Sequence, residues 1–240
     1  MQSSSSTPRG VYVTGTDTGV GKTLASAALL HAVRATGVTV AGMKPVASGS
    51  IETGAGWRNE DALALQAAAS AGLAYDDINP YALPLPTAPQ LAARAAGIEV
   101  RLDVLLAAHA RLVAAAGTVV VEGVGGWMAP LADGCEQADL VRALRLPVIL
   151  VVGLRLGCLS HARLSARAIA ADGCVLAGWI GSAVEAGFDA DGHYRALLAS
   201  ALAAPCLGRL AHMPAPDPAE LAGQLTLPPA LSPERACAPG

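Results

Sequence analysis

The sequence predicts a single α/β domain of three layers, with helices on both sides of a mostly parallel central sheet. Short apolar runs rich in β-branched residues alternate along the chain with longer stretches of helical spacing. Such units, joined by right-handed crossovers, build a parallel sheet that helices cover. Neither an internal repeat nor a linker divides the 240 residues. We therefore expect one domain, whose elements are justified below in chain order.

The first unit is a strand, a glycine-rich loop and a helix. Residues 11–13 favour a strand, residues 15–23 read Gly-Thr-Asp-Thr-Gly-Val-Gly-Lys-Thr, and residues 24–33 have helical spacing. In this setting backbone N–H groups and the helix dipole bind phosphate, with Lys22 bridging the terminal phosphates and Thr23 holding Mg²⁺. The loop is a variant, because threonine stands where the strict pattern has its first glycine. A P-loop NTPase fold is expected.

A second strand is expected over residues 38–43, with residues 44–50 leaving its C-terminal end. Ligands collect at these ends in open parallel sheets. Lys44 is one of only two lysines among the 16 lysines and arginines. A compact ammonium differs from a guanidinium most beside phosphates. Lys44 is therefore a candidate active-site residue, and an accident of composition is the alternative.

Residues 51–58 are expected to form a glycine-containing loop before a helix over residues 60–69, with Asn59 as its N-cap. Asp61 falls in the first turn of that helix. A carboxylate there is stabilised by the helix dipole. Asp61 is thus either a helix-stabilising residue or a ligand residue.

In the middle of the chain, a predicted strand ends at a carboxylate, Glu122, which is expected at the edge of the sheet. Residues 79–89 are proline-rich and predicted to be irregular, and helices are expected over residues 90–95 and 102–116. Residues 118–121 form a β-branched, buried strand that ends at Glu122. The glycines that follow let the backbone approach a ligand. Glu122 fits a metal-linked carboxylate, and a solvated strand-end glutamate is the alternative.

The C-terminal half repeats the alternation. Residues 156–160 form a second helix entrance that could hold an anion with backbone N–H groups. From Pro228 onward, proline and small residues predict a loose tail. The predicted organisation is a leader over residues 1–9, a domain over 10–227 and a tail over 228–240. The remaining expected elements are strands over 146–153, 175–180 and 206–210, a helix starting near 160, and a helix over 193–202.

Composition excludes several classes of protein. A net charge of -3 with scattered arginines and 3% aromatic residues argues against a nucleic-acid partner. No run approaches the ~20 apolar residues of a membrane helix, and the N-terminus lacks a signal-peptide core. A cytoplasmic location without membrane contact is expected. Five widely spaced cysteines suggest neither a disulfide framework nor a zinc site.

Several segments together resemble the dethiobiotin synthetase family. They occur in family order and span roughly residues 10–210. The segments are VTGTDT at 13–18, VGKT at 20–23, KPVASGS at 44–50, DALALQ at 61–66, VEG at 121–123, GGW at 125–127, PVILVVG at 147–153, LGC at 156–158, HA at 161–162 and LAGW at 176–179.

The resemblance implies an ATP-dependent ligase of biotin biosynthesis that acts as a homodimer. In that family 7,8-diaminononanoate takes up CO₂ (or bicarbonate) as a carbamate. The carbamate attacks the γ-phosphate of ATP to give a carbamic-phosphoric anhydride, and the second amine closes the ureido ring with release of ADP and phosphate. ATP is a co-substrate and Mg²⁺ is the implied cofactor.

The resemblance also assigns site residues. Lys22 and Lys44 would be catalytic, and Thr23, Asp61 and Glu122 would hold Mg²⁺. The substrate-binding residues would be Thr18, Ser48, Gly157, Cys158, Leu159, Ser160 and Tyr194, with the 157–160 loop and Tyr194 serving the neighbouring subunit's site. The nucleotide would contact Gly19, Val20, Gly21, Lys22, Thr23, Leu24, Asp61, Glu122, Gly123, Val124, Gly125, Ser182, Ala183, Ala211, His212 and Met213.

The chain departs from the family pattern around the base. Ser182 and Ala183 stand where better-known members have Asn-Asp, and residues 211–213 replace a Pro-Trp-Leu segment. A serine hydroxyl cannot supply the paired donor and acceptor of an amide. Gly19 stands where a glutamate is common. Relaxed base selectivity is therefore predicted.

Two other interpretations were weighed. A P-loop switch or positioning ATPase without a small-molecule product would usually carry a lysine where this chain has Asp17. An amidotransferring ligase for cobyrinic-type acids would need a glutamine-hydrolysing domain, for which 240 residues leave no room. Lys44 and Ser48 after the second strand favour the synthetase.

Overall fold

The computed structural model describes residues 10–70 and 72–232 and confirms the α/β fold. Six strands form one sheet in the order β10-β9-β8-β1-β7-β2, and every neighbouring pair runs parallel. These strands are β1 (Gly10–Gly15), β2 (Val40–Met43), β7 (Thr118–Gly126), β8 (Val148–Gly153), β9 (Leu176–Ser182) and β10 (Cys206–Leu210).

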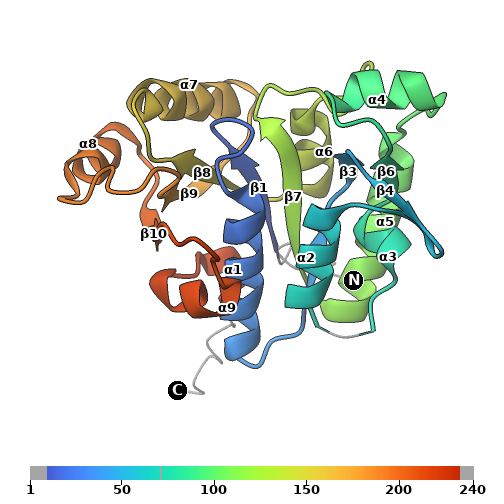
Figure 1. Ribbon diagram of the computed structural model, residues 1–240, viewed down its shortest axis with the longest axis horizontal. Coiled ribbons are helices and arrows are strands. Elements are labelled where there is room, and N and C mark those ends of the chain that lie inside the picture. Colours follow the sequence, from blue (N-terminus) through green and yellow to red (C-terminus); the bar gives the residue numbers. More distant parts are fainter. Residues whose placement is uncertain (1–9, 71, 233–240) are drawn as a thin grey trace, which may run out of the picture.

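Helices cover both faces of this sheet (Figure 1). The longer helices are α1 (Lys22–Ala35), α2 (Glu60–Ala68), α4 (Pro89–Ala96), α5 (Leu102–Ala116), α6 (Gln137–Leu144), α7 (Cys158–Ala171) and α8 (His193–Ala201). The shorter ones are α3 (Tyr75–Ile78), α9 (Pro218–Leu221), η1 (Ala222–Gln224) and η2 (Pro229–Leu231).

Side chains alternate along β1 between two buried layers, as the pleat of a strand requires. Val11 and Val13 pack with α1 and α9, whereas Tyr12 points to the opposite face and packs with residues of α5 and α6. A third cluster joins β8 and β9 to α7 and α8. Burial on both faces explains why the parallel strands read as continuous apolar runs.

The structure corrects the predicted loops. Residues 51–58 form an antiparallel hairpin of β4 (Ile51–Thr53) and β5 (Gly56–Arg58), because Gly56 takes a left-handed φ of 98° that lets the chain reverse. Within the predicted irregular segment, β6 (Tyr81–Leu83) pairs with β3 (Val46–Ser48). Strand β7 continues beyond residue 121 to Gly126, and α6 lies in a segment for which no element was predicted.

Two further findings concern predicted features outside the sheet. Residues 229–231 of the predicted tail form the η2 turn, and Leu231 is buried with residues of α1, while residues 1–9 and 233–240 lie outside the described residues. Cys135 and Cys158 are buried, whereas Cys206 is exposed. In the described part of the chain, no helix combines the length and apolarity needed to cross a bilayer.

Candidate active site

The glycine-rich loop connects the end of β1 to the start of α1. Gly21 is the N-cap of α1 and adopts a left-handed φ of 85°, which favours glycine. A Cβ at this position would also lie 2.6 Å from Oγ of Ser182, at the end of β9. Glycine is therefore required at residue 21 by both conformation and space, and the loop is held against a strand two places away in the sheet.

Asp17 stabilises the loop from within. Its Oδ1 accepts a hydrogen bond from the backbone N–H of Thr18 at 2.7 Å, and its Oδ2 pairs with Arg155 at 2.6 Å. Arg155 follows β8, so this contact joins the loop to the neighbouring strand. The carboxylate thus fills a structural role at the position where a switch ATPase would carry a lysine.

Lys22 lies largely buried under the loop. Its Nζ donates a hydrogen bond to the carbonyl of Asp17 at 3.0 Å. Burial, followed by the positive charge of Lys44, lowers the pKa of Lys22 from 10.5 to about 8, against the opposing pull of Glu122, Asp61 and Asp17. Both lysines of the chain therefore lie close enough to influence each other's charge.

Lys44 lies at the centre of a buried charge cluster. Its Nζ is 2.6 Å from Oε1 of Glu122 and 2.9 Å from Oδ2 of Asp61, and it donates to the carbonyl of Gly123 at 3.1 Å. Burial acts to lower the pKa of Lys44, but the two carboxylates outweigh it and the pKa is raised. The pKa of Asp61 is lowered, because Lys44 outweighs the opposing effect of burial. Lys44 therefore stays charged in the interior.

Thr23 joins both carboxylates. Its hydroxyl lies 2.8 Å from Oδ1 of Asp61 and 2.9 Å from Oε1 of Glu122. One hydroxyl proton can serve only one of these acceptors at a time. The other carboxylate oxygen of Glu122, Oε2, is buried and has no hydrogen-bond partner among the described residues. Such an oxygen is costly to bury unless a cation or donor reaches it.

This oxygen set fits Mg²⁺, a hard cation that binds one or two protein carboxylates and keeps other ligands from phosphate and water. No group of three or more His, Cys, Asp or Glu side chains able to hold a metal occurs within residues 10–70 and 72–232. An all-protein metal cage is therefore not present in that part of the chain. Thr23, Asp61 and Glu122 instead resemble a site completed by a nucleotide.

Buried amides fix the backbone around Lys44. Asn79 donates to the carbonyl of Lys44 at 2.7 Å, and its own carbonyl accepts from the hydroxyl of Tyr75 at 3.2 Å. Asn59 caps α2, as predicted, by accepting from the N–H of Asp61 at 3.1 Å, and it donates to the carbonyl of Ser48 at 3.2 Å. This network sets three predicted site residues relative to one another.

A cavity of about 750 Å³ opens above the cluster. It brings together residues predicted to bind phosphate and metal with two of the seven predicted substrate residues, Thr18 and Ser48. The predicted residues Glu122 and Gly123 do not line it. Predicted residues on its wall are Thr18, Gly19, Gly21, Lys22, Thr23, Lys44, Ser48, Asp61, Val124 and Gly125, and residues that the sequence did not indicate are Ala47, Asn59, Pro86, Thr87, Ala88, Pro89, Ala129 and Pro130.

A second, smaller cavity of about 200 Å³ lies on the other side of the loop, after β9 and β10. It collects the residues that the sequence predicted to surround the base. Its wall contains Gly19, Gly21, Leu24, Ser182, Ala183, Ala211, His212 and Met213, together with Val184 and Pro216. Gly19 and Gly21 are shared by both cavities, so the glycine loop separates the cavity lined by predicted phosphate residues from the cavity lined by predicted base residues.

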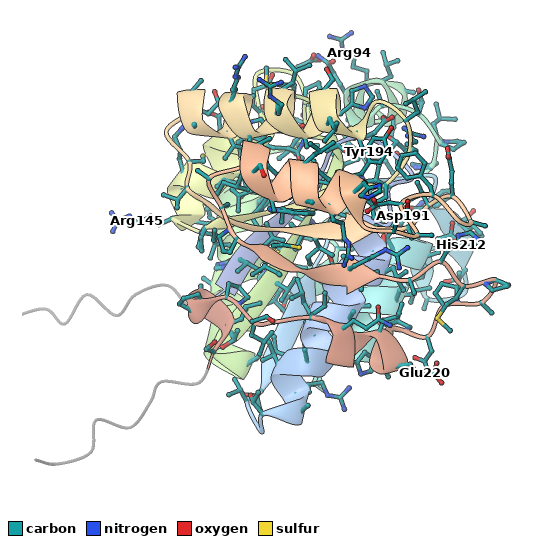
Figure 2. All side chains as sticks on the ribbon, turned by 90° about the vertical axis from the view of Figure 1, so that its left-hand side faces the viewer. Arg94, Arg145, Asp191, Tyr194, His212 and Glu220 are labelled. Atoms are coloured by element: carbon teal, nitrogen blue, oxygen red, sulfur yellow. The ribbon has the colours of Figure 1, made fainter. Side chains whose placement is uncertain are left out.

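Other predicted residues lie away from both cavities. The side chain of Val20 is buried among core residues, which leaves only its backbone for a ligand. Gly157 caps α7, the Cys158 side chain is buried in the third core cluster, and Tyr194 packs on Phe188 with ring centroids 4.6 Å apart. Figure 2 shows Tyr194 on α8 and His212 after β10, both on the side opposite Arg145, which precedes β8.

These residues at the start of α7 and in α8, with Leu159 and Ser160, do not line the cavities of this chain. Their predicted role in a neighbouring subunit's site stays a prediction. Asn79 and Tyr75 were not predicted from the sequence, because a single amide or phenol has no distinguishing pattern. Asn79 acts through the carbonyl of Lys44 and Tyr75 through the N–H of Asn59, and only the fold brings these backbone groups to them.

The chain is similar to known proteins over most of its length. Residues 9–219 match the family model described as an AAA domain. The chain is 56% identical over 221 residues to the ATP-dependent dethiobiotin synthetase BioD of Xanthomonas oryzae pv. oryzae (strain PXO99A), covering 92% of this chain and 99% of that protein. It is 55% identical over 215 residues to the protein of the same name from Xylella fastidiosa (strain 9a5c), covering 89% of this chain and 95% of that protein.

Solved structures are similar in fold alone. The MinC:MinD cell division protein complex of Aquifex aeolicus matches with a TM-score of 0.54 at 12% identity, covering 86% of this chain and 82% of that chain. The signal recognition particle receptor FtsY of Elizabethkingia anophelis in complex with GDP matches with a TM-score of 0.51 at 16% identity; 96% of this chain is covered, but it spans only 64% of that chain.

Proposed function

The chain belongs to the family of ATP-dependent dethiobiotin synthetases, ligases of biotin biosynthesis. We propose that its larger cavity is the site where 7,8-diaminononanoate, CO₂ and ATP are converted to dethiobiotin, ADP and phosphate. One observation carries this proposal: both lysines of the chain and two carboxylates converge beneath the glycine loop, next to the cavity.

The first steps develop negative charge on oxygen. An amine of the diamine adds to CO₂ and loses a proton, giving a carbamate. A carbamate oxygen then attacks the γ-phosphorus of ATP, the bond to the β-phosphate oxygen breaks, and ADP leaves. Preorganised cations that face developing charge stabilise such transition states. Lys22 and Lys44 fit this task, because both stand at the cavity and neither needs to be moved there.

Ring closure depends more on the positioning of the second amine than on further stabilisation of charge. The second amine attacks the carbon of the carbamic-phosphoric anhydride, expels phosphate and loses a proton. Thr18 and Ser48 line the cavity and offer hydroxyl groups to the carbamate or the diamine. Holding both ends of a flexible diamine lowers the entropy cost of the reaction. No residue needs to form a covalent intermediate.

Thr23, Asp61 and Glu122 would hold Mg²⁺. Bound there, Mg²⁺ would neutralise phosphate charge on the nucleotide. The unpaired Oε2 of Glu122 and the shared Thr23 hydroxyl support this assignment. The base of ATP would enter the smaller cavity between Leu24, Ser182 and His212.

We also propose a homodimer. The helix entrance at residues 157–160 and Tyr194 would receive the carboxylate tail of the diamine bound in the partner's cavity. Support comes from their placement: they form no part of the wall of either cavity in their own chain. Sedimentation of the purified protein, with and without the diamine, tests the dimer directly.

The test of the function is phosphate release from ATP by purified protein in the presence of Mg²⁺. It is measured with and without 7,8-diaminononanoate and bicarbonate, while dethiobiotin is followed by mass. We expect release to require the diamine and to yield dethiobiotin in equal amount. Release that is independent of the diamine and gives no product would contradict the proposal.

The relatives do not favour the alternative of a switch ATPase. The full-length relatives are named for synthesis of dethiobiotin, and the likeness to the MinC:MinD complex is one of fold only. The structural role of Asp17 in the loop points the same way.

A further inference from the structure

Gln137, the first residue of α6, is fully buried and does not line either cavity. Its side-chain amide lies at the centre of a turn around residues 123–129, which begins in the last residues of β7. The nitrogen Nε2 carries two N–H groups and lies within hydrogen-bonding distance of four backbone carbonyls, those of Gly126 at 2.7 Å, Ala129 at 3.0 Å, Val124 at 3.1 Å and Trp127 at 3.1 Å. The turn is therefore wrapped around one side chain.

The orientation of the amide is fixed by its second partner. Oε1 of Gln137 accepts from the hydroxyl of Tyr12 at 2.9 Å and from the N–H of Val124 at 3.3 Å. Burial raises the pKa of Tyr12 well above its ordinary value, so this hydroxyl keeps its proton. The opposite orientation would set an acceptor against four carbonyls. Glutamine is thus suited to this position, and glutamate is not.

The backbone approaches the amide closely just after Glu122. A Cβ on Gly123 would lie 2.2 Å from Oε1 of Gln137 and 2.7 Å from the hydroxyl of Tyr12. The carbonyl of Gly123 is the one that accepts from Lys44 at 3.1 Å. The same amide therefore borders the residue that holds Lys44 and the turn that walls the cavity.

Val124, Gly125, Ala129 and Pro130 from this turn line the larger cavity. The base end of the site lies on the far side of the glycine loop, after β9 and β10, and Gln137 has no contact with it. Loss of the amide should thus disturb the wall that faces the reacting groups and leave the base cavity in place.

We propose that Gln137 is a positioning residue for ring closure, which it serves by holding the turn over residues 123–129 and, through Gly123, Lys44. The inference rests on the proposed function, because it assumes that the chemistry takes place in the larger cavity. Gln137 itself touches neither nucleotide nor diamine.

The test compares Gln137→Met with Val141→Ala. Val141 is buried on the same helix, is not part of the hydrogen-bonded turn, and controls for loss of stability. We expect Gln137→Met to lower kcat for dethiobiotin at least tenfold while KM for ATP changes less than threefold, since the base end is untouched. At an equal loss in Tm, Val141→Ala should keep the kcat of the unaltered protein.

Tyr12→Phe provides a second variant if Gln137→Met does not fold. It removes only the donor to Oε1 and keeps the edge-on packing against Trp127, whose ring centroid is 6.3 Å away. We expect a roughly threefold loss of kcat, again without change in KM for ATP. If the folded variants match Val141→Ala in kcat, the proposal is wrong. If the unaltered protein makes no dethiobiotin, the proposed function fails instead.

Discussion

The two ends of the nucleotide site differ in how they are built. At the proposed phosphate end, Asp61 and the fully buried Glu122 share the hydroxyl of Thr23, and Lys44 pairs with both carboxylates. The base end offers small or apolar side chains and only two polar groups, the hydroxyl of Ser182 and the ring of His212, whose Nδ1 lies 3.1 Å from the carbonyl of Ala183. The proposed phosphate end therefore holds several charged side chains at fixed positions, whereas the wall of the proposed base end has few polar groups.

This difference separates chemistry from recognition of the base. Interactions that strengthen in the transition state raise kcat, whereas contacts equally strong before it change only binding. Substitutions at the phosphate end should therefore reduce turnover, and those at the base end should alter nucleotide preference by small factors. Four measurements test this contrast, and they are given in order of decreasing expected effect.

Lys44→Ala should have the largest effect. It removes a buried cation that faces developing charge, and loss of one such group typically costs about 10²- to 10³-fold in rate. We expect ring closure to be abolished within the limits of a mass-spectrometric assay, while ADP still binds when measured by calorimetry. Near-normal turnover would mean that Lys44 is merely structural and that the proposed phosphate end does not control the rate.

Glu122→Gln should change the demand for Mg²⁺. The amide keeps the shape of the side chain but withdraws a charged oxygen, and weakened metal sites commonly lose about 10- to 100-fold in affinity. We expect the Mg²⁺ concentration for half-maximal activity to rise by such a factor. Ser182→Ala, at the base end, serves as the control whose Mg²⁺ curve should stay in place. An unchanged curve for Glu122→Gln would speak against the metal assignment.

The pKa of Lys22 makes nucleotide binding depend on pH. At about 8, this pKa lies below the ordinary lysine value of 10.5, so free Lys22 loses its proton as the pH rises through 8. Bound phosphate favours the charged form; affinity for ADP should therefore be full well below pH 8 and weaken roughly thirtyfold by pH 9.5. Calorimetry across this pH range measures the affinity for ADP. Lys22→Arg should bind with no pH step, because arginine stays charged. A flat profile for the unaltered protein would be the contrary result.

Base preference should show the smallest effect. A well-formed bidentate contact to a base is worth roughly 1–3 kcal/mol, and neither Ser182 nor His212 supplies a side-chain amide of that kind. We expect kcat/KM for ATP to exceed that for CTP and GTP by less than about tenfold. Side-by-side kinetics with the three nucleotides provide the measurement. A steep preference for ATP would mean that backbone groups after β9 and β10 read the base.

Local sequence was sufficient where an element carries its own signal. The strand, glycine loop and helix over residues 10–35 and the helix over residues 102–116 were predicted from periodicity, and the N-cap at Asn59 from residue type. The hairpin at residues 51–58 and strand β6 were missed. The hairpin strands β4 and β5 are mostly exposed and carry no apolar alternation that would mark them as strands. Strand β6 pairs with β3, which lies more than 30 residues earlier in the chain, so the local pattern does not reveal it.

The candidate site divides in the same way. Lys22, Lys44, Asp61 and Glu122 were indicated by residue type at strand and helix ends, where parallel sheets bind ligands. Asn79 and Gln137 were not, because their partners are backbone carbonyls, which every residue carries.

Residue type and local pattern were therefore enough to predict the fold class, the phosphate-binding loop, the family and the charged residues of the candidate site. The strand order that places β7 between β1 and β2, and with it the meeting of Glu122, Lys44 and Thr23, is evident only in the folded chain. The same is true of the buried amides that hold them. Local propensity depends on neighbouring residues, whereas the order of strands in the sheet and the burial of a single amide depend on contacts between residues far apart in the chain.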